Sequence, residues 1–352
     1  MHGRTLLLLL ALLAGAATAF CEEGPNAEPL TRIAFGSCNR EYKAQPLWQP
    51  ILACKPEVWI WLGDIVYGRA DDLSDLARRY RSEKEQPEYT ALRHQTRVLG
   101  IWDDNDYGVS NGGAENANKQ KSQSLLLDFL DEPAESPRRA QAGVYAAYTF
   151  GPSGKQVKVI LLDNRYNREE PARPWEGIFG TPAPTSDILG AQQWAWLEEQ
   201  LAGSTADINL IGSGVQVIPN EHPYEKWGEF PEARARLFNL LAKTKARNVI
   251  FLSGDRHLGE ISRCVDPRIT SAIYDITSSG MTHHATNGFL HNFEREQNRF
   301  RLGRNYVALN FGLLEIDWSA TPPVVTAQIR GVDNVVAIQE KITLAPATAG
   351  QR

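Results

Sequence analysis

The sequence has no excess of basic residues. It contains 37 Lys and Arg against 42 Asp and Glu, which gives a formal net charge of -5 over 352 residues. Proteins that bind nucleic acids carry a basic surface, so a nucleic-acid partner is not expected. Internal repeats, low-complexity tracts and long linkers are also missing. The absence of a linker favours one domain over two, and a monomer is the simplest assembly.

Long apolar runs are missing as well. No segment after the N-terminus approaches the 18 apolar residues of a membrane-spanning helix, so no retained membrane span is expected. A shorter run, Leu6 to Leu13, follows Arg4 and precedes Ala17-Thr18-Ala19. This order is typical of a secretory signal peptide, and a retained anchor is the weaker alternative. We expect residues 1–19 to be a signal peptide and residues 20–352 to be one secreted or periplasmic domain.

Cysteine is scarce. In an exported chain an even number of cysteines suggests a disulfide, but four cysteines allow three pairings. The four are Cys21, Cys38, Cys54 and Cys264. Cys38 has a second possible role, because it ends a predicted strand. The pairing among the other three stays open.

Six short runs, rich in β-branched, aromatic and Leu residues, are nearly continuous in hydrophobicity. They cover residues 32–38, 58–64, 98–104, 159–165, 208–216 and 248–257. Strands buried on both faces have this composition. Amphipathic segments lie between them, including one with Ser186 as a possible N-cap and one that starts at Pro231. Alternating strands and helices predict a layered α/β fold, and the last 50 residues favour added antiparallel strands.

Each of the six runs ends in polar residues. These are Cys38, Asp64, Asp103 with Asp104, Asp163 with Arg165, Gln216, and Asp255 with His257. Ligands bind beyond the carboxyl ends of strands in open α/β sheets. Taken singly, each residue has an ordinary alternative role, such as a cap, a turn or a buried thiol. Together, the carboxylates would repel one another strongly without cations. The recurrence therefore predicts a site for more than one metal ion.

The chain resembles the alkaline phosphatase D (PhoD-like) group of calcineurin-like metallophosphoesterases over residues 30–340. The motifs that carry the resemblance are "FGSC" (35–38), "GDIVY" (63–67), "WDDNDYG" (102–108), "LLDNR" (161–165), "LGAQQWAWLEEQL" (189–201), "GSGVQV" (212–217), "FPEARARL" (230–237), "LSGDRH" (252–257) and "SSGMTHH" (278–284). The resemblance implies a four-layer α/β/β/α sandwich in which two mixed sheets lie between helices. It also implies metal-dependent hydrolysis of a small phosphoester.

The resemblance further implies a set of protein ligands for each metal ion. Cys38, Asp64, Tyr67 and His257 would hold Fe³⁺, and Asp103, Asp104 and Asp255 would hold Ca²⁺ or another divalent ion, with Asp64 as the bridge. The donor types agree, since thiolate and phenolate suit a transition metal and carboxylates suit a hard ion. Asp106 is left unassigned.

Other polar residues of these motifs are candidates for substrate contacts. Arg165 and Arg256 are candidate phosphate donors, because guanidinium matches phosphate in a bidentate way. Each could equally form a structural ion pair. Gln216 ends a strand where many metallophosphoesterases place a histidine ligand. His283 lies in the "THH"-like loop of the family, where an ordinary loop histidine is the simpler alternative.

One position departs from the family pattern. Relatives commonly have "DDHD", and this chain has Asn105 at the third position. Asn can donate a hydrogen bond but cannot act as a general acid. The hypothesis is therefore an exported phosphomonoesterase or phosphodiesterase that uses metal-activated water. The alternative is a non-catalytic relative that binds metal and phosphate and has lost the acid.

Overall fold

The computed structural model describes residues 28–171, 186–286 and 292–346. The predicted signal peptide and Cys21 lie outside these ranges. Among the described residues, no helix has the length and apolar character needed to span a membrane. Cys38, Cys54 and Cys264 are free thiols, so no disulfide joins any two of these three.

The first sheet combines the predicted N-terminal strands with the C-terminal ones. Its order is β12-β11-β10-β1-β2-β3, made of β1 (Arg32–Gly36), β2 (Val58–Leu62), β3 (Arg97–Ile101), β10 (Phe311–Asp317), β11 (Val324–Arg330) and β12 (Val336–Thr343). β1, β2 and β3 are parallel, and β10, β11 and β12 add to β1 as antiparallel strands. The predicted antiparallel addition is confirmed.

The second sheet has the order β4-β5-β6-β7-β9-β8. Its strands are β4 (Ala146–Phe150), β5 (Val157–Leu161), β6 (Ile208–Ser213), β7 (Val249–Ser253), β8 (Gly259–Cys264) and β9 (Ile273–Ser278). β5, β6, β7 and β9 are parallel, while β4 and β8 are antiparallel edge strands. All six predicted apolar runs are strands, and both sheets are mixed.

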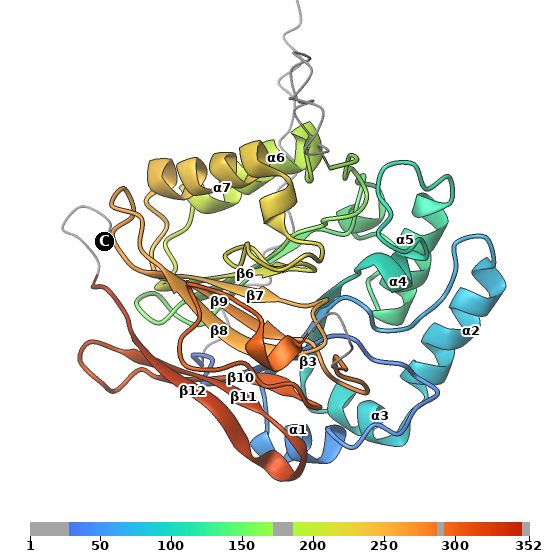
Figure 1. The fold of residues 1–352 in the computed structure, drawn as a ribbon, viewed down its shortest axis with the longest axis horizontal. Coiled ribbons are helices and arrows are strands. Elements are labelled where there is room, and N and C mark those ends of the chain that lie inside the picture. Colours follow the sequence, from blue (N-terminus) through green and yellow to red (C-terminus); the bar gives the residue numbers. More distant parts are fainter. Residues whose placement is uncertain (1–27, 172–185, 287–291, 347–352) are drawn as a thin grey trace, which may run out of the picture.

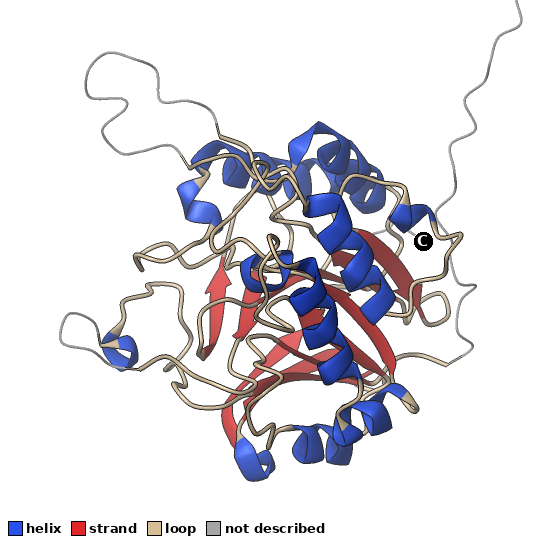
Figure 2. Ribbon diagram, turned by 90° about the vertical axis from the view of Figure 1, so that its right-hand side faces the viewer, coloured by secondary structure: helices blue, strands red, loops and turns tan. Residues whose placement is uncertain are grey.

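Helices cover the outer faces of the two sheets (Figures 1 and 2). α6 (Gly190–Ala202) and α7 (Pro231–Thr244) share a buried apolar cluster with the second sheet. The helices on the other side are α1 (Trp48–Cys54), α2 (Leu73–Lys84), α3 (Pro87–Arg93), α4 (Asp104–Tyr107) and α5 (Lys119–Phe129). Short 3-10 helices η1 (Pro137–Arg139), η2 (Trp227–Glu229), η3 (Phe293–Arg295) and η4 (Val332–Asn334) lie in connections. The four-layer α/β/β/α fold is confirmed.

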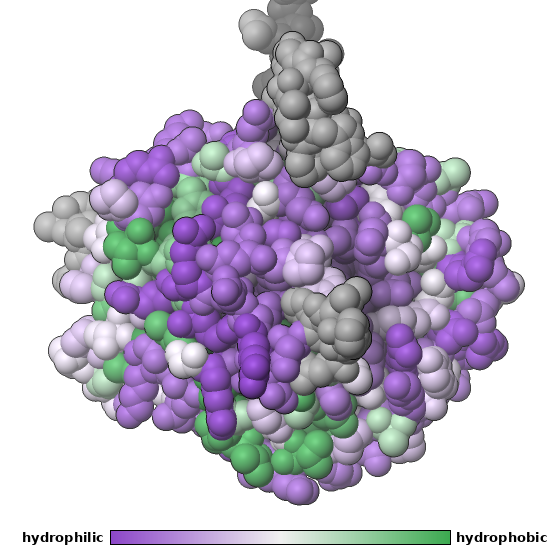
Figure 3. All heavy atoms as spheres, viewed as in Figure 1, coloured by the Kyte–Doolittle hydropathy of each residue, from purple (hydrophilic) through white to green (hydrophobic). Residues whose placement is uncertain are grey.

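The core between the layers explains why these sequences adopt this arrangement. On β2, the side chains alternate, so Trp59 and Trp61 share one face and pack edge-on against Trp48 of α1 at 5.2 and 5.6 Å between ring centroids. Apolar residues of both sheets belong to one buried cluster. The outer surface is mainly polar on the face shown in Figure 3, with its largest apolar area at the lower edge.

Two helix starts test the cap predictions. α7 begins at Pro231, as predicted. Ser186 is not the N-cap of α6, which begins four residues later at Gly190. The Asp187 carboxylate instead accepts the backbone N–H groups of residues 188 to 190. A carboxylate does this better than a hydroxyl because it can accept several N–H groups at once.

Candidate metal centre and active site

The candidate site lies where the carboxyl ends of parallel strands from both sheets meet. Cys38, Asp64, Asp103 and Asp255 each lie two residues beyond the last residue of β1, β2, β3 and β7, respectively. The two sheets approach closely here. A Cβ at Gly214, after β6, would lie 2.6 Å from Asp103 Oδ1. Only glycine allows this approach, which brings strand ends that are distant in sequence into one site.

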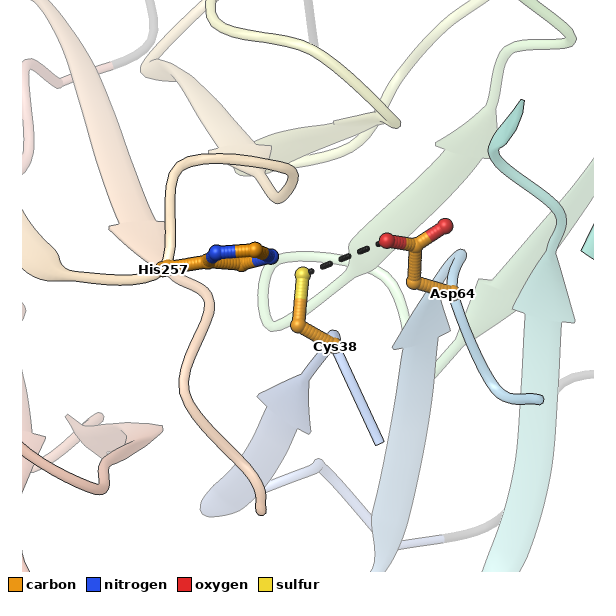
Figure 4. A group of neighbouring side chains, drawn as sticks. All are labelled: Cys38, Asp64 and His257. Carbon is orange, nitrogen blue, oxygen red and sulfur yellow. Dashed lines mark hydrogen bonds between the residues drawn. The ribbon is translucent and has the colours of Figure 1, made fainter. Parts of the chain in front are cut away.

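Two groups of ligand atoms share Asp64. Cys38, Asp64 and His257 form the first, and Asp64, Asp103 and Asp104 form the second; within each group the ligand atoms lie within 4.8 Å of one another. Figure 4 shows the first group, in which the three side chains point toward one another and Cys38 Sγ lies 3.5 Å from Asp64 Oδ2. Asp64 belongs to both groups, and this is the position expected of a carboxylate that bridges two metal ions.

Four predicted ligands have left-handed backbone conformations. The φ angles are 61° at Cys38, 52° at Asp64, 67° at Asp255 and 56° at His257. This conformation is uncommon for residues with a Cβ and costs of order 1 kcal/mol each. Such strain concentrates where a side chain must be held for function. Its occurrence at four residues of one cluster sets these loops apart from ordinary turns.

Tyr67 and His283 join the first group through a chain of short contacts. Tyr67 donates its hydroxyl hydrogen to Asp64 Oδ2 at 2.9 Å, and its oxygen lies 3.0 Å from His283 Nε2. His283 Nε2 in turn lies 3.2 Å from His257 Nε2. The structure therefore places both residues beside the predicted ligands, and His283 is closer to the site than an ordinary loop histidine would be.

The charges in this cluster are unbalanced without a cation. Burial, then Asp104 and Asp103, raise the pKa of Asp64 well above its usual range. Burial, then Glu225 and Asp104, raise the pKa of Asp255 to about 7. Burial, then Asp64, raise the pKa of Tyr67 well above 10. A metal ion would reverse each of these effects, because positive charge favours the ionised ligands.

Two carboxylates retain free acceptor capacity, which a metal ion would use. Asp103 Oδ2 is buried and has no hydrogen-bond partner. Within the described ranges, the Asp255 carboxylate makes no hydrogen bond or ion pair, although Asp104 lies close enough to affect its pKa. Buried polar atoms without a partner are costly. The donor set and these unused oxygens therefore fit a pair of metal ions.

Asp106 and Asn105 have different roles in the same loop. Asp106 accepts the backbone N–H groups of Asp64 at 3.1 Å, Asp103 at 2.7 Å and Ile65 at 3.1 Å. It therefore holds the backbone of two predicted ligands. Asn105 Nδ2 lies inside the cluster and donates to Asp64 Oδ2 at 3.0 Å and to Asp104 Oδ1 at 2.8 Å.

Three other predicted site residues, the two arginines and Gln216, make their polar contacts with other side chains of the protein. Arg165 is buried and pairs with Asp103 and with Glu225. Burial would lower the pKa of Arg165, but these two carboxylates raise it well above its usual value. Arg256 is buried and pairs with Glu296 at 2.6 Å. Both arginines therefore have the ion pairs that were the alternative to phosphate binding.

Gln216 is also turned toward the protein. Its Nε2 donates to Glu260 Oε1 at 2.6 Å and to Thr277 Oγ1 at 2.7 Å. Its Oε1 is buried with no hydrogen-bond partner. The strand-end position of Gln216 is as predicted, but these contacts give it a supporting place in the fold.

Sequence reasoning missed two residues near the cluster. Ser279 Oγ lies 3.1 Å from Cys38 Sγ and accepts the backbone N–H of His257 at 2.7 Å. Glu225 is the first charge that acts on Asp255, and it holds Arg165 against Asp103. Ser279 lies in the motif "SSGMTHH", which also contains His283, so this motif could have identified Ser279 as a candidate site residue. No local signal marks Glu225, because its partner Arg165 is 60 positions away.

Comparisons with known proteins agree with this geometry. A solved structure of PhoD superposes with a TM-score of 0.67 and 17% identity, covering 93% of this chain and 74% of that one. A dimetal phosphatase from Danio rerio gives a TM-score of 0.51 and 16% identity, covering 90% of this chain and 100% of that one. At these identities the likeness establishes a shared fold and nothing more.

The sequence matches are more specific. The family described as PhoD-like phosphatase matches residues 68–306. Alkaline phosphatase D of Bacillus subtilis (strain 168) is 23% identical over 282 residues, which cover 66% of this chain and 47% of that protein. This chain thus spans about half the length of that curated relative. It belongs to the PhoD-like phosphatase family, and this membership supports a phosphoric ester hydrolase.

Proposed function

We propose that this protein is a metal-dependent phosphoester hydrolase that acts on small phosphomonoesters, phosphodiesters or both. The observation that carries the proposal is the pair of ligand groups that share Asp64 at the meeting point of the two sheets. Two metal ions bound there would neutralise charge on a phosphate and activate a water molecule at neutral pH. Membership of the PhoD-like phosphatase family supports the same reaction.

The donor chemistry favours two different ions. Cys38, Asp64, Tyr67 and His257 would hold Fe³⁺, because thiolate and phenolate suit a transition metal. Asp103, Asp104 and Asp255 would hold Ca²⁺ or another hard divalent ion. We expect the purified protein to contain iron and a second divalent metal, and to absorb visible light through charge transfer to iron. A colourless protein that contains only zinc would contradict this assignment.

The residues around the cluster define how a phosphate would be received. The Asn105 amide donates to both Asp64 and Asp104, so it could donate to a phosphate oxygen only after a metal ion bound by one of these carboxylates had released one of its two N–H groups. It carries no titratable proton. Burial, then His257, lower the pKa of His283 to about 3, so its ring is neutral at pH 7 and holds its contact with Tyr67. Substrates that need little protonation of the leaving group are therefore favoured.

A comparison of ester types tests this role of Asn105. Wild-type protein should have a higher kcat/KM for aryl than for alkyl esters, because a general acid contributes roughly 100- to 10,000-fold and alkyl esters need it more. Asn105→His should accelerate the alkyl esters more than the aryl ones. An unchanged ratio, with metals still bound, would assign proton donation to another residue.

A non-catalytic binding protein is the second candidate function. Asn105 favours it specifically, since this is where relatives have histidine. The two candidates differ in the release of phenol from an activated aryl phosphate. An enzyme releases it continuously, whereas a binding protein binds metal and inorganic phosphate and releases none.

Two further features belong to this proposal. The predicted cleavage near Ala19 would place the mature protein outside the cytoplasm, and N-terminal sequencing of the secreted form tests it. The cluster of apolar residues common to both sheets supports a single domain over residues 20–352. A monomer in solution is expected from sedimentation analysis.

A further inference from the structure

The two arginines first considered for phosphate binding are held in buried ion pairs, but a third arginine lies beside the cluster. Arg40 is two residues beyond Cys38 and retains partial exposure. No carboxylate in the described part of the chain lies within ion-pair distance of it. Its Nε is buried and has no hydrogen-bond partner. Arg256 Nε also lacks a partner, but Arg256 has the carboxylate of Glu296, whereas Arg40 has no carboxylate among the described residues, so its charge and its remaining N–H donors are left for a ligand.

The position of Arg40 is set on two sides. Its guanidinium carbon lies 4.6 Å from the centroid of the Tyr67 ring, and the hydroxyl of that ring contacts Asp64. Its backbone N–H donates to Thr282 Oγ1 at 2.7 Å, next to His283. The charge of Arg40 therefore faces the first ligand group.

A positive charge adds to this edge of the site. Lys43 is exposed, and its backbone N–H donates to Arg40 O at 2.8 Å in a turn. Two cations in this turn after Cys38 would repel a metal ion rather than help to bind it. A negatively charged ligand bound in front of the metals would explain why Arg40 and Lys43 lie here.

We propose that Arg40 binds the substrate phosphate, with its guanidinium donating hydrogen bonds to a non-bridging phosphate oxygen beside the Cys38, Asp64 and His257 group. This inference rests on the proposed function, since it places a phosphate at that group. The planar fork of arginine suits phosphate better than an ammonium does. Lys43 adds longer-range attraction for the same anion.

Inorganic phosphate is the probe for this proposal. Its dissociation constant with metal-loaded protein is measured by calorimetry for wild type, Arg40→Met, Arg40→Lys and the control Arg78→Met. Met keeps much of the packing on Tyr67 and removes the charge. Arg78 is 64% exposed in α2 and pairs only with Asp75. Metal content and thermal midpoint are recorded for each variant.

We expect phosphate to bind Arg40→Met roughly 10- to 100-fold more weakly, the value for one or two charge-assisted hydrogen bonds. Arg40→Lys should lie between this variant and wild type, and Arg78→Met should match wild type, all with unchanged metal content. Equal phosphate affinity in Arg40→Met and wild type would overturn the proposal. So would loss of metal from both Arg40 variants, because Arg40 would then hold the ligand loop. If phosphate affinity falls as expected but wild type releases no phenol from an aryl phosphate, the proposed function fails and the role of Arg40 stands.

Discussion

The two sheets have similar polar residues at their strand ends but use them differently. In the first sheet, the loops after β1, β2 and β3 supply Cys38, Asp64, Asp103 and Asp104, all of which belong to the ligand groups. In the second sheet, the loop after β5 supplies Asp163, whose two oxygens accept hydrogen bonds within the protein. The loop after β6 supplies Gln216, whose Nε2 donates within the protein while its Oε1 has no partner. Among the described loops of the second sheet, the one after β7 places His257 in a ligand group, and it also holds Asp255, a predicted ligand that lies outside both groups.

The difference depends on whether the protein itself satisfies each polar group. Asp163 accepts four hydrogen bonds, from Trp102 Nε1 and from the backbone N–H groups of Val144, Arg165 and Tyr166. It needs no cation. Asp103, by contrast, is buried with one oxygen unpartnered. A strand-end carboxylate is therefore a candidate ligand when its acceptor capacity is left unused, and a structural residue when it is filled.

The largest expected effect is at Asp64, which belongs to both groups. Asp64→Asn should remove both metals and lower kcat/KM by roughly a thousandfold or more, since bound metals supply several kcal/mol of transition-state stabilisation. Asp71→Asn is the control, because the Asp71 side chain is 65% exposed and pairs only with Arg69. Elemental analysis and steady-state kinetics measure the effect. If Asp64→Asn still binds both metals fully, Asp64 does not bridge them.

Asp106 should have a smaller effect through its hold on the ligand loops. Asp106→Asn turns an N–H donor toward at least one of the three backbone N–H groups that Asp106 accepts. Outer contacts of this kind typically change metal affinity or activity by roughly 10- to 100-fold. Metal titration of the variant, with activity recovered at high metal concentration, would identify a positioning residue. A loss that no metal concentration restores would indicate that Asp106 has a direct role.

Substitution of Asp163 tests whether this strand-end carboxylate of the second sheet stabilises the fold and does not bind metal. Asp163→Asn should lower the free energy of unfolding by about 1–3 kcal/mol, because one backbone N–H loses its acceptor in a buried place. Metal content and kcat/KM should stay near the wild-type values. Denaturant unfolding measures the first quantity, and elemental analysis the second. Loss of metal with unchanged stability would reverse the proposed contrast between the sheets.

Much of this contrast could be predicted from the sequence, and part of it could not. Buried parallel strands are almost continuously apolar, so the strands and the polar residues that end them are visible directly. The partners of those polar residues are not, since Arg165 meets Asp103 and Glu225 about 60 positions away on either side. The left-handed conformations at Cys38 and His257 leave no sequence signature, because neither is a glycine.

The last expected effect is on stability alone, within one pH window, and concerns a buried carboxylate that is outside the ligand groups. Burial raises the pKa of Glu83 to about 7, from 4.5. The folded state therefore binds more protons than the unfolded state between pH 4.5 and 7, and the free energy of unfolding falls as pH rises through this window. Glu83→Gln should remove this dependence, worth at most about 3 kcal/mol, and leave metal content unchanged. An identical pH dependence of stability in the variant would show that other groups cause it.

The dependence of hydrolysis on metal occupancy is the most direct test of whether the ligand groups around Asp64 are the catalytic site. Purified protein is assayed with an aryl phosphate before chelation, after chelation and dialysis, and during stepwise return of iron and a divalent ion, with the bound metal counted at each step. We predict that activity disappears with the metals and returns as both ligand groups around Asp64 are filled. If the protein hydrolyses the aryl phosphate equally well after the metals have been removed, hydrolysis does not depend on metals bound around Asp64.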